Sequence, residues 1–327
     1  MDYFTRRGDK LICLLCNKYC HLDKGQIGLC GVNKNVGDHI ECLVYGYPTA
    51  MNIDPVEKKP LYHFLPQTKT FSIGTVGCNF RCSFCQNHSL SQDKKIKTDK
   101  YYSPEDIVSL AKTNNCESIS FTYNEPTIFY PYAKDIALKA KKQGIKTIYV
   151  SNGFESIEVI QDMKEVIDAV NIDLKCFNEK YYRSLGGKLS EVLENLKEFK
   201  KSGIWLEITT LIVPTKNDSY EELKEIANFI KNELGEDTPW HISAFHPDFK
   251  ELNLPRTSIE SLKMAYNLGH ELGLNYVYIG NSNFENSTIC EKCNKVMIKR
   301  TYFNTIENNI INKRCSNCDA LMPGIYE

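Results

Sequence analysis

Three cysteines stand within eight residues of one another in the run GTVGCNFRCSFCQN. Cys78, Cys82 and Cys85 are separated by three and then two residues, and no fourth cysteine follows closely. Thiolates hold cubane [4Fe–4S] clusters, and a closed cluster needs four of them. A loop that supplies three leaves one iron open to an outside ligand, and an open position distinguishes a metal site that does chemistry from a structural one. A zinc knuckle is the simpler alternative for so short a motif.

A second cysteine set lies near the C-terminus and is complete. Its two CxxC pairs, separated by 21 residues, are Cys290, Cys293, Cys315 and Cys318. Two such pairs are typical of a zinc ribbon, in which four thiolates close a tetrahedral structural site. A rubredoxin-like iron site is the alternative, because four sulfur ligands suit either metal. The residues between the pairs alternate in hydrophobicity and predict a short hairpin.

A third set lies near the N-terminus and is also complete. Its spacing is C-x2-C-x3-C-x9-C, and its members are Cys13, Cys16, Cys20 and Cys30. Zinc is the first choice of metal and an auxiliary iron–sulfur cluster the second. Four ligands leave no open position in either case, so the set should brace the fold or relay electrons.

The composition of the 327 residues, 42% hydrophobic and 25% charged, is typical of a soluble globular protein. A formal net charge of −1 argues against broad attraction to nucleic acid or to an anionic membrane. No apolar run approaches the roughly 20 residues that cross a bilayer, and the N-terminus lacks the apolar core of a signal peptide. We therefore expect a cytoplasmic protein whose cysteines form metal sites rather than disulfides. Eleven of the fourteen belong to the three sets, and the isolated Cys42, Cys116 and Cys176 are expected to be small core residues.

Strand-like and helix-like segments alternate through the middle of the chain. The strand-like segments are 69–77, 117–123, 145–153, 169–175, 204–214, 240–245 and 275–281. Helix-like segments separate them, and the first begins with Ser103 as N-cap and Pro104 at the first helical position. Strands spaced in this way predict right-handed crossovers and a parallel sheet. We expect an α/β fold, a partial (β/α)6 TIM-like barrel with small cysteine-rich extensions at both ends.

Three regions follow from this pattern. We expect a cysteine-rich N-terminal extension and linker over 1–66, the partial barrel over 67–284 and a ribbon-like module over 285–327. Within the linker, two prolines bracket the charged segment DPVEKKP, which a rigid surface loop explains. A substrate-facing role for Asp54, Glu57, Lys58 and His63 is the alternative.

Polar residues are concentrated on the predicted strands and where these strands end. The candidates are Tyr123, Asn124, Glu125, Ser151, Asn152, Asp173, Lys175, Glu207 and His241, with Thr209 and Ser243 accompanying the last two on their strands. In parallel barrels the working residues lie at the C-terminal ends of the strands. Beside a cysteine loop, such a collection indicates a ligand site. The alternative for Asp173 and Lys175 is an ordinary ion pair, since residues two apart share one face of a strand.

The cysteine run resembles that of the radical S-adenosylmethionine (SAM) superfamily. The order of DPVEKKPLYHF, the cysteine loop, FTYNEPT, SNGF, NIDLK, WHISAFHP and a final ribbon resembles the radical SAM protein of the AmmeMemoRadiSam system, a relative of pyruvate formate-lyase activating enzymes. The resemblance covers essentially the whole chain. It implies a [4Fe–4S] cluster and SAM, an external one-electron reductant of the ferredoxin or flavodoxin type, and companion proteins of the Memo and AMMECR types.

The resemblance also implies roles for individual residues. The YNEP stretch at 123–126 stands where activating enzymes have Gly-Gly-Glu-Pro at the SAM amino group, so Glu125 is the matching acid. Asp173 and Lys175 in NIDLK match residues that hold the ribose and the SAM carboxylate. The SNG stretch at 151–153 matches Thr-Asn-Gly, and His241 matches a late-strand histidine near the adenosine. Glu207 stands where these enzymes carry an arginine, and its role stays open.

These observations favour a radical enzyme that needs no catalytic side chain beyond the cluster and SAM. Our first hypothesis is hydrogen abstraction from a protein or peptide substrate, as an activating enzyme does. Modification of RNA or of a small molecule is the alternative among enzymes, and the near-neutral charge weighs against RNA. A metal-stabilised scaffold or electron carrier without SAM turnover is the alternative from another class.

Overall fold

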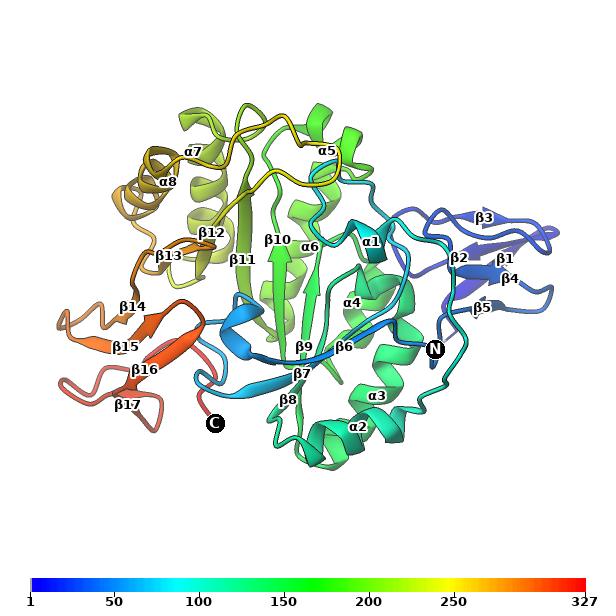
Figure 1. The fold of residues 1–327 in the computed structure, drawn as a ribbon, viewed down its shortest axis with the longest axis horizontal. Helices are drawn as coiled ribbons and strands as arrows, with labels where there is room; N and C mark the ends of the chain where they lie inside the picture. The colour runs from blue at the N-terminus through cyan, green and yellow to red at the C-terminus, as the bar shows by residue number, and fades with distance from the viewer. Residues whose placement is uncertain (1) are drawn as a thin grey trace.

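The computed structural model describes residues 2–327, and an eight-stranded sheet forms its centre (Figure 1). The strands, in chain order, are β6 (Ala50–Pro55), β7 (Lys69–Gly74), β8 (Ser118–Phe121), β9 (Lys146–Ser151), β10 (Ala169–Asp173), β11 (Trp205–Ile212), β12 (Trp240–Ala244) and β13 (Val277–Gly280). Neighbours from β7 to β13 pair in parallel, in chain order, and β6 pairs antiparallel with β7 at one edge. The expected partial barrel is confirmed.

Helices follow the parallel strands and cover the sheet. They are α2 (Pro104–Thr113), α3 (Tyr130–Lys142), α4 (Ile157–Met163), α5 (Glu179–Leu185), α6 (Leu189–Ser202), α7 (Tyr220–Phe229) and α8 (Ile259–Glu271), with the short α1 (His88–Ser91) in the cysteine loop. The predicted start of α2 is confirmed, because Ser103 and Asp106 form a capping box. In α3, Tyr132, Ile136 and Ala140 recur every fourth residue and are fully buried, which seats the helix on the sheet. Among residues 2–327, no helix has both the length and the apolar character needed to span a bilayer.

Two small cysteine-rich units flank the sheet on opposite sides (Figure 1). The N-terminal unit contains β1 (Phe4–Arg7), β2 (Lys10–Cys13), β3 (His21–Leu22), β4 (Asn33–Asn35) and β5 (Ile40–Cys42). The C-terminal ribbon contains β14 (Asn286–Ile289), β15 (Val296–Thr301), β16 (Asn304–Asn308), β17 (Ile310–Ile311) and β18 (Arg314–Cys315), so a hairpin is present between its cysteine pairs. The division expected at residue 66 differs from the structure, because β6 already belongs to the central sheet.

Arg300 of β15 joins the ribbon to the sheet and is fully buried. Its guanidinium donates to the backbone oxygen of Tyr62 at 2.6 Å and to Thr288 Oγ1 at 2.8 Å. It also lies 4.4 Å from the centre of the Tyr62 ring and 4.0 Å from a carboxylate oxygen of Glu57. The segment after β6 therefore serves as the surface on which the ribbon packs.

Candidate functional site

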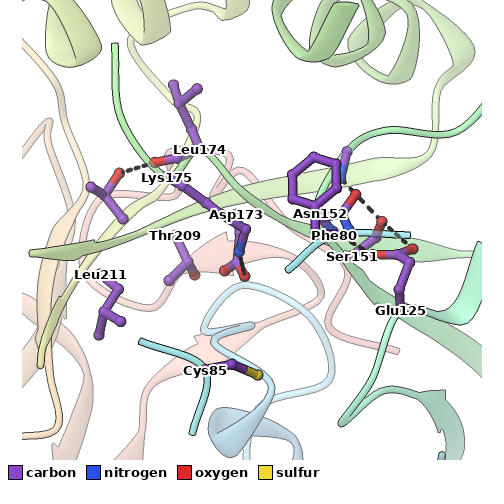
Figure 2. A network of polar contacts seen from close by, with 12 residues as sticks. Phe80, Cys85, Glu125, Ser151, Asn152, Asp173, Leu174, Lys175, Thr209 and Leu211 are labelled. Atoms are coloured by element: carbon purple, nitrogen blue, oxygen red, sulfur yellow. Dashed lines mark hydrogen bonds and ion pairs between the residues drawn. The ribbon is translucent and has the colours of Figure 1, made fainter. Parts of the chain in front are cut away.

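A pocket of about 250 Å³ opens at the C-terminal ends of the parallel strands. The three loop cysteines line it, as do seven of the nine polar residues expected at a ligand site, namely Tyr123, Asn124, Glu125, Ser151, Asn152, Asp173 and Lys175. Figure 2 shows Asp173 and Lys175 facing this space from one side and Glu125 and Ser151 from the other, with Cys85 below them. The fold thus brings together residues that are far apart in the sequence.

Asn124 fixes the backbone that leads into the cysteine loop. Its amide nitrogen donates to Thr75 Oγ1 at 3.0 Å and to the Gly77 carbonyl at 2.9 Å. Its amide oxygen accepts from the Thr75 backbone N–H at 3.0 Å. Because Asn124 is buried and satisfied in this way, its side chain acts by holding the loop in place.

The loop thiols are arranged for a group larger than a single ion. Cys78 Sγ accepts from the Phe80 backbone N–H at 3.3 Å, and Cys85 Sγ lies 3.1 Å from Ser91 Oγ. Within residues 2–327, the ribbon cysteines are the only set of three or more metal-ligating groups with all ligand atoms within 4.8 Å of one another. The three loop sulfurs are not all within this distance of one another. A cubane cluster does not require such close contact, because each thiolate binds a different iron.

Asp173 and Lys175 form an ion pair beside the cysteine loop. Lys175 Nζ lies 2.7 Å from Asp173 Oδ2, and their side chains are 12% and 38% exposed. Burial acts to lower the pKa of Lys175, but the carboxylate of Asp173 and the nearby Cys82 keep it above its usual value. The pocket therefore holds a fixed cation beside a carboxylate that a ligand can still reach.

Glu125 joins the ends of β8 and β9. One of its oxygens accepts from Ser151 Oγ at 2.8 Å, and the other accepts from the Asn152 backbone N–H at 2.9 Å. Ser151 Oγ also lies 2.5 Å from Glu155 Oε1, so two buried carboxyl groups share one hydroxyl. Burial raises the pKa of both carboxyl groups, for Glu155 to about 8. The hydrogen bonds of Glu125 identify it as a positioning residue.

The buried Glu155 should make stability depend on pH. Its pKa rises from 4.5 to about 8 on folding, so over this range the folded chain holds a proton that the unfolded chain releases. The free energy of unfolding should therefore fall as pH rises from 4.5 to 8. Glu155→Gln should flatten that slope and leave the variant relatively more stable at the alkaline end. Urea unfolding across this range, with the exposed Glu165→Gln as control, checks the result, and equal slopes in all three proteins would contradict it.

Tyr123 has φ +71°, a left-handed conformation that a residue without a side chain adopts more readily. Its hydroxyl donates to Asp54 Oδ2 at 2.6 Å, and the Lys59 ammonium lies 4.7 Å from its ring centre. Burial acts to raise the pKa of Asp54, but Lys59 and Lys58 hold it well below its usual value. The charged DPVEKK segment thus holds the strained turn at the pocket wall.

Glu207 and His241 do not reach the pocket. Glu207 is fully buried and accepts from His241 Nε2 at 2.6 Å. It also accepts from two backbone N–H groups of the segment after β6, those of Tyr62 at 3.0 Å and His63 at 2.8 Å. Both residues lie near the starts of their strands, and Thr209, Leu211 and Ser243 line the pocket from those strands instead.

Two functional candidates were missed from the sequence. Glu155 lies just past the SNG stretch, and its carboxyl belongs to the network around Ser151. Asn79 lies between two of the loop cysteines and accepts from Asn152 Nδ2 at 2.8 Å. The position of Asn79 inside the cysteine motif is a signal that could have identified it.

Comparison with known proteins agrees with this geometry. The family model of the radical SAM superfamily matches residues 72–230, which span the cysteine loop and the strands from β7 to β11. The chain belongs to the radical SAM superfamily. An uncharacterised protein of Methanocaldococcus jannaschii is 40% identical to this radical SAM protein over 97% of this chain and 96% of its own length.

Two further similarities concern the radical SAM region. The pyruvate formate-lyase-activating enzyme of Clostridium pasteurianum is 26% identical over 54% of this chain and 77% of its own length. The crystal structure of a radical SAM methyltransferase from Sphaerobacter thermophilus superposes with a TM-score of 0.52 and 14% identity, covering 67% of this chain and 68% of that one. The second similarity shows the fold alone. Both four-cysteine sets of this radical SAM protein lie outside residues 72–230.

Proposed function

We propose that this chain is an activating-enzyme-like radical SAM enzyme that abstracts hydrogen from a protein or peptide substrate. Cys78, Cys82 and Cys85 would ligate the [4Fe–4S] cluster, and SAM would occupy the strand-end pocket. When bound and reduced, such a cluster cleaves SAM to methionine and a 5′-deoxyadenosyl radical. One observation carries the proposal: the three cysteines line the same pocket as the Asp173–Lys175 pair.

The residues of the pocket have distinct tasks in this proposal. Lys175 offers a buried cation to the SAM carboxylate, and a lysine pairs with a carboxylate as a point charge. Asp173 is the more exposed partner and can accept from ribose hydroxyls. Asn124 and Glu125 hold the walls of the pocket. The protein thus contributes position, charge and exclusion of water, while the cofactor supplies the chemistry.

A protein or peptide substrate is supported by the similarity to the pyruvate formate-lyase-activating enzyme. The net charge of −1 gives RNA no general attraction. The segment 246–254 lies beside the cysteine loop, because the Lys250 backbone N–H donates to the Ser83 carbonyl at 3.0 Å and Ser83 Oγ donates to Glu251 at 2.6 Å. We propose that this segment borders the opening through which the substrate approaches.

The test is anaerobic reconstitution with iron and sulfide, followed by SAM and a strong reductant. We expect 5′-deoxyadenosine from the unaltered chain and none from Cys85→Ala, because loss of a thiolate removes the cluster. Cys116→Ala is the matched control, since Cys116 is buried beside α2 and outside all three cysteine sets, and it should retain turnover.

The product also separates the alternatives. Cluster and SAM bound without any 5′-deoxyadenosine would overturn the enzyme proposal in favour of a scaffold or carrier. With turnover established, deuterium transfer from labelled candidate peptides into 5′-deoxyadenosine would support the peptide class. Transfer only from RNA or a small molecule would contradict it.

A further inference from the structure

The N-terminal cysteines surround a small, largely enclosed cavity. Cys13 ends β2, Cys16 and Cys20 lie in the loop between β2 and β3, and Cys30 precedes β4. All four line the cavity together with Asn33, Asn79 and Ile128. A thiol-lined space of this kind suits a metal group with soft ligands.

The ribbon cysteines show what a single-ion site looks like in this chain. Cys290 Sγ lies 3.7 Å from Cys318 Sγ, and Cys293 Sγ lies 3.6 Å from Cys315 Sγ. Four sulfurs at about 2.3 Å from one zinc ion stand about 3.8 Å apart, so this set fits zinc.

The N-terminal set has a different geometry. In the part of the chain that the structure describes, no three of its sulfurs lie within 4.8 Å of one another, although all four cysteines line one cavity. The loop cysteines of the SAM site share this wider spacing. Sulfurs that surround a space instead of contacting one another fit a cubane, whose four irons each take one thiolate.

Two amide side chains face this set. Asn33 Nδ2 donates to Cys30 Sγ at 3.4 Å. Asn79 is 5% exposed and lines the cavity, where its Nδ2 makes no well-aligned hydrogen bond among residues 2–327 but lies within reach of the Cys16 thiol. A buried donor without a well-aligned acceptor costs about 1–3 kcal/mol, so thiolate or sulfide acceptors in the cavity would stabilise this amide. The sulfides and thiolates of a cluster accept such hydrogen bonds, which tune its reduction potential.

This cavity adjoins the loop of the SAM site. Asn79 follows Cys78 directly, and a Cβ on Gly77 would lie 2.6 Å from the Cys30 carbonyl oxygen. Cys30 and Cys78 also line one surface groove. The basic residues of that groove are Lys18, Arg81, Lys94, Arg183 and Lys188, and it has no acidic lining residue. The two cysteine sets therefore lie on loops in direct contact.

We propose that Cys13, Cys16, Cys20 and Cys30 hold a second, closed [4Fe–4S] cluster, which exchanges single electrons with the cluster site at Cys78, Cys82 and Cys85. The second part of this proposal rests on the proposed function; the first does not. One electron from a ferredoxin- or flavodoxin-type donor reduces the N-terminal cluster from 2+ to 1+. Passing it on reduces the SAM-site cluster by one electron and returns the first to 2+, and no bond forms or breaks.

The test uses the full chain with Cys78, Cys82 and Cys85 all replaced by alanine, reconstituted without oxygen in the presence of iron, sulfide and zinc. We expect about four irons per chain, as in one cubane, and an electron paramagnetic resonance signal on reduction that SAM does not alter. Zinc in place of iron at both remaining sets would overturn the proposal. This readout involves no SAM turnover, so it stands or falls independently of the proposed function.

The unaltered chain gives a second measurement that does not depend on how the variant folds. We expect about eight irons per chain, two cubanes, and reduced-state resonance signals broadened by magnetic coupling between the clusters. About four irons, with a single signal altered by SAM, would overturn the second cluster. Two uncoupled signals would overturn the electron exchange.

Discussion

Replacing Lys175 by methionine should weaken SAM binding by roughly tenfold to a hundredfold. A hydrogen bond to a charged group contributes about 1.5–3 kcal/mol, and each 1.4 kcal/mol is tenfold in affinity. The loss should be large because Lys175 is 12% exposed, so water replaces it poorly. The variant also leaves the Asp173 carboxylate without its cation, facing the carboxylate of SAM.

Calorimetric titration of SAM into the anaerobically reconstituted protein measures this effect. Lys180→Met is the matched control, because Lys180 lies exposed on α5 and outside the pocket, and its affinity should be unchanged. The iron content of both variants should equal that of the unaltered chain. An unchanged affinity in Lys175→Met would remove the lysine from the proposed site.

Arg300→Met should lower the free energy of unfolding by about 3–5 kcal/mol, the usual effect of removing one partner from a buried charged network. Arg300 is fully buried and donates to Tyr62 and Thr288, so its loss leaves the Tyr62 carbonyl without this donor, whereas the Thr288 hydroxyl keeps its hydrogen bond with Tyr278. It also leaves the buried Glu57 without the nearest cation. The ribbon and the segment after β6 should both lose stability, because Arg300 contacts both.

Lys299→Met provides an adjacent control. Lys299 is 44% exposed and contributes a surface ion pair with Glu285, so its replacement should change stability by about 0.5 kcal/mol or less. Urea unfolding of the metal-loaded full chain, with hydrogen exchange to locate the loss, compares the variants. Equal stabilities would mean that Arg300 does not anchor the ribbon.

Most of the central sheet and its helices could be predicted because the sequence features that indicate each element lie within that element. The capping box at Ser103 and the regular burial along α3 lie within single segments. The position of β6 could not be predicted in this way, since it depends on pairing with β7 rather than on its own residues. Its polar and charged neighbours read equally well as a surface loop.

Those residues of the candidate site that directly follow a strand end could be predicted from the sequence. Asp173 and Lys175 follow directly from the end of β10. The prediction that Glu207 and His241 line the pocket failed because the position of a residue along its strand also decides whether it reaches the pocket. Thr209 and Leu211 share a face with Glu207 but lie further along β11, at about 3.3 Å per residue. The sequence pattern indicates which residues of a strand share one face. Which of those residues lie beside the pocket depends on how the neighbouring strands pair.

The contact between Gly77 and Cys30 also constrains how this chain can change during evolution. Gly77 has φ +90°, and its missing Cβ would lie 2.6 Å from the Cys30 carbonyl. Any side chain there would push the N-terminal unit away from the cysteine loop. Loss of the first thirty residues would remove this closest contact, but the φ of Gly77 and the neighbouring Val32 and Ile128 would still favour glycine there.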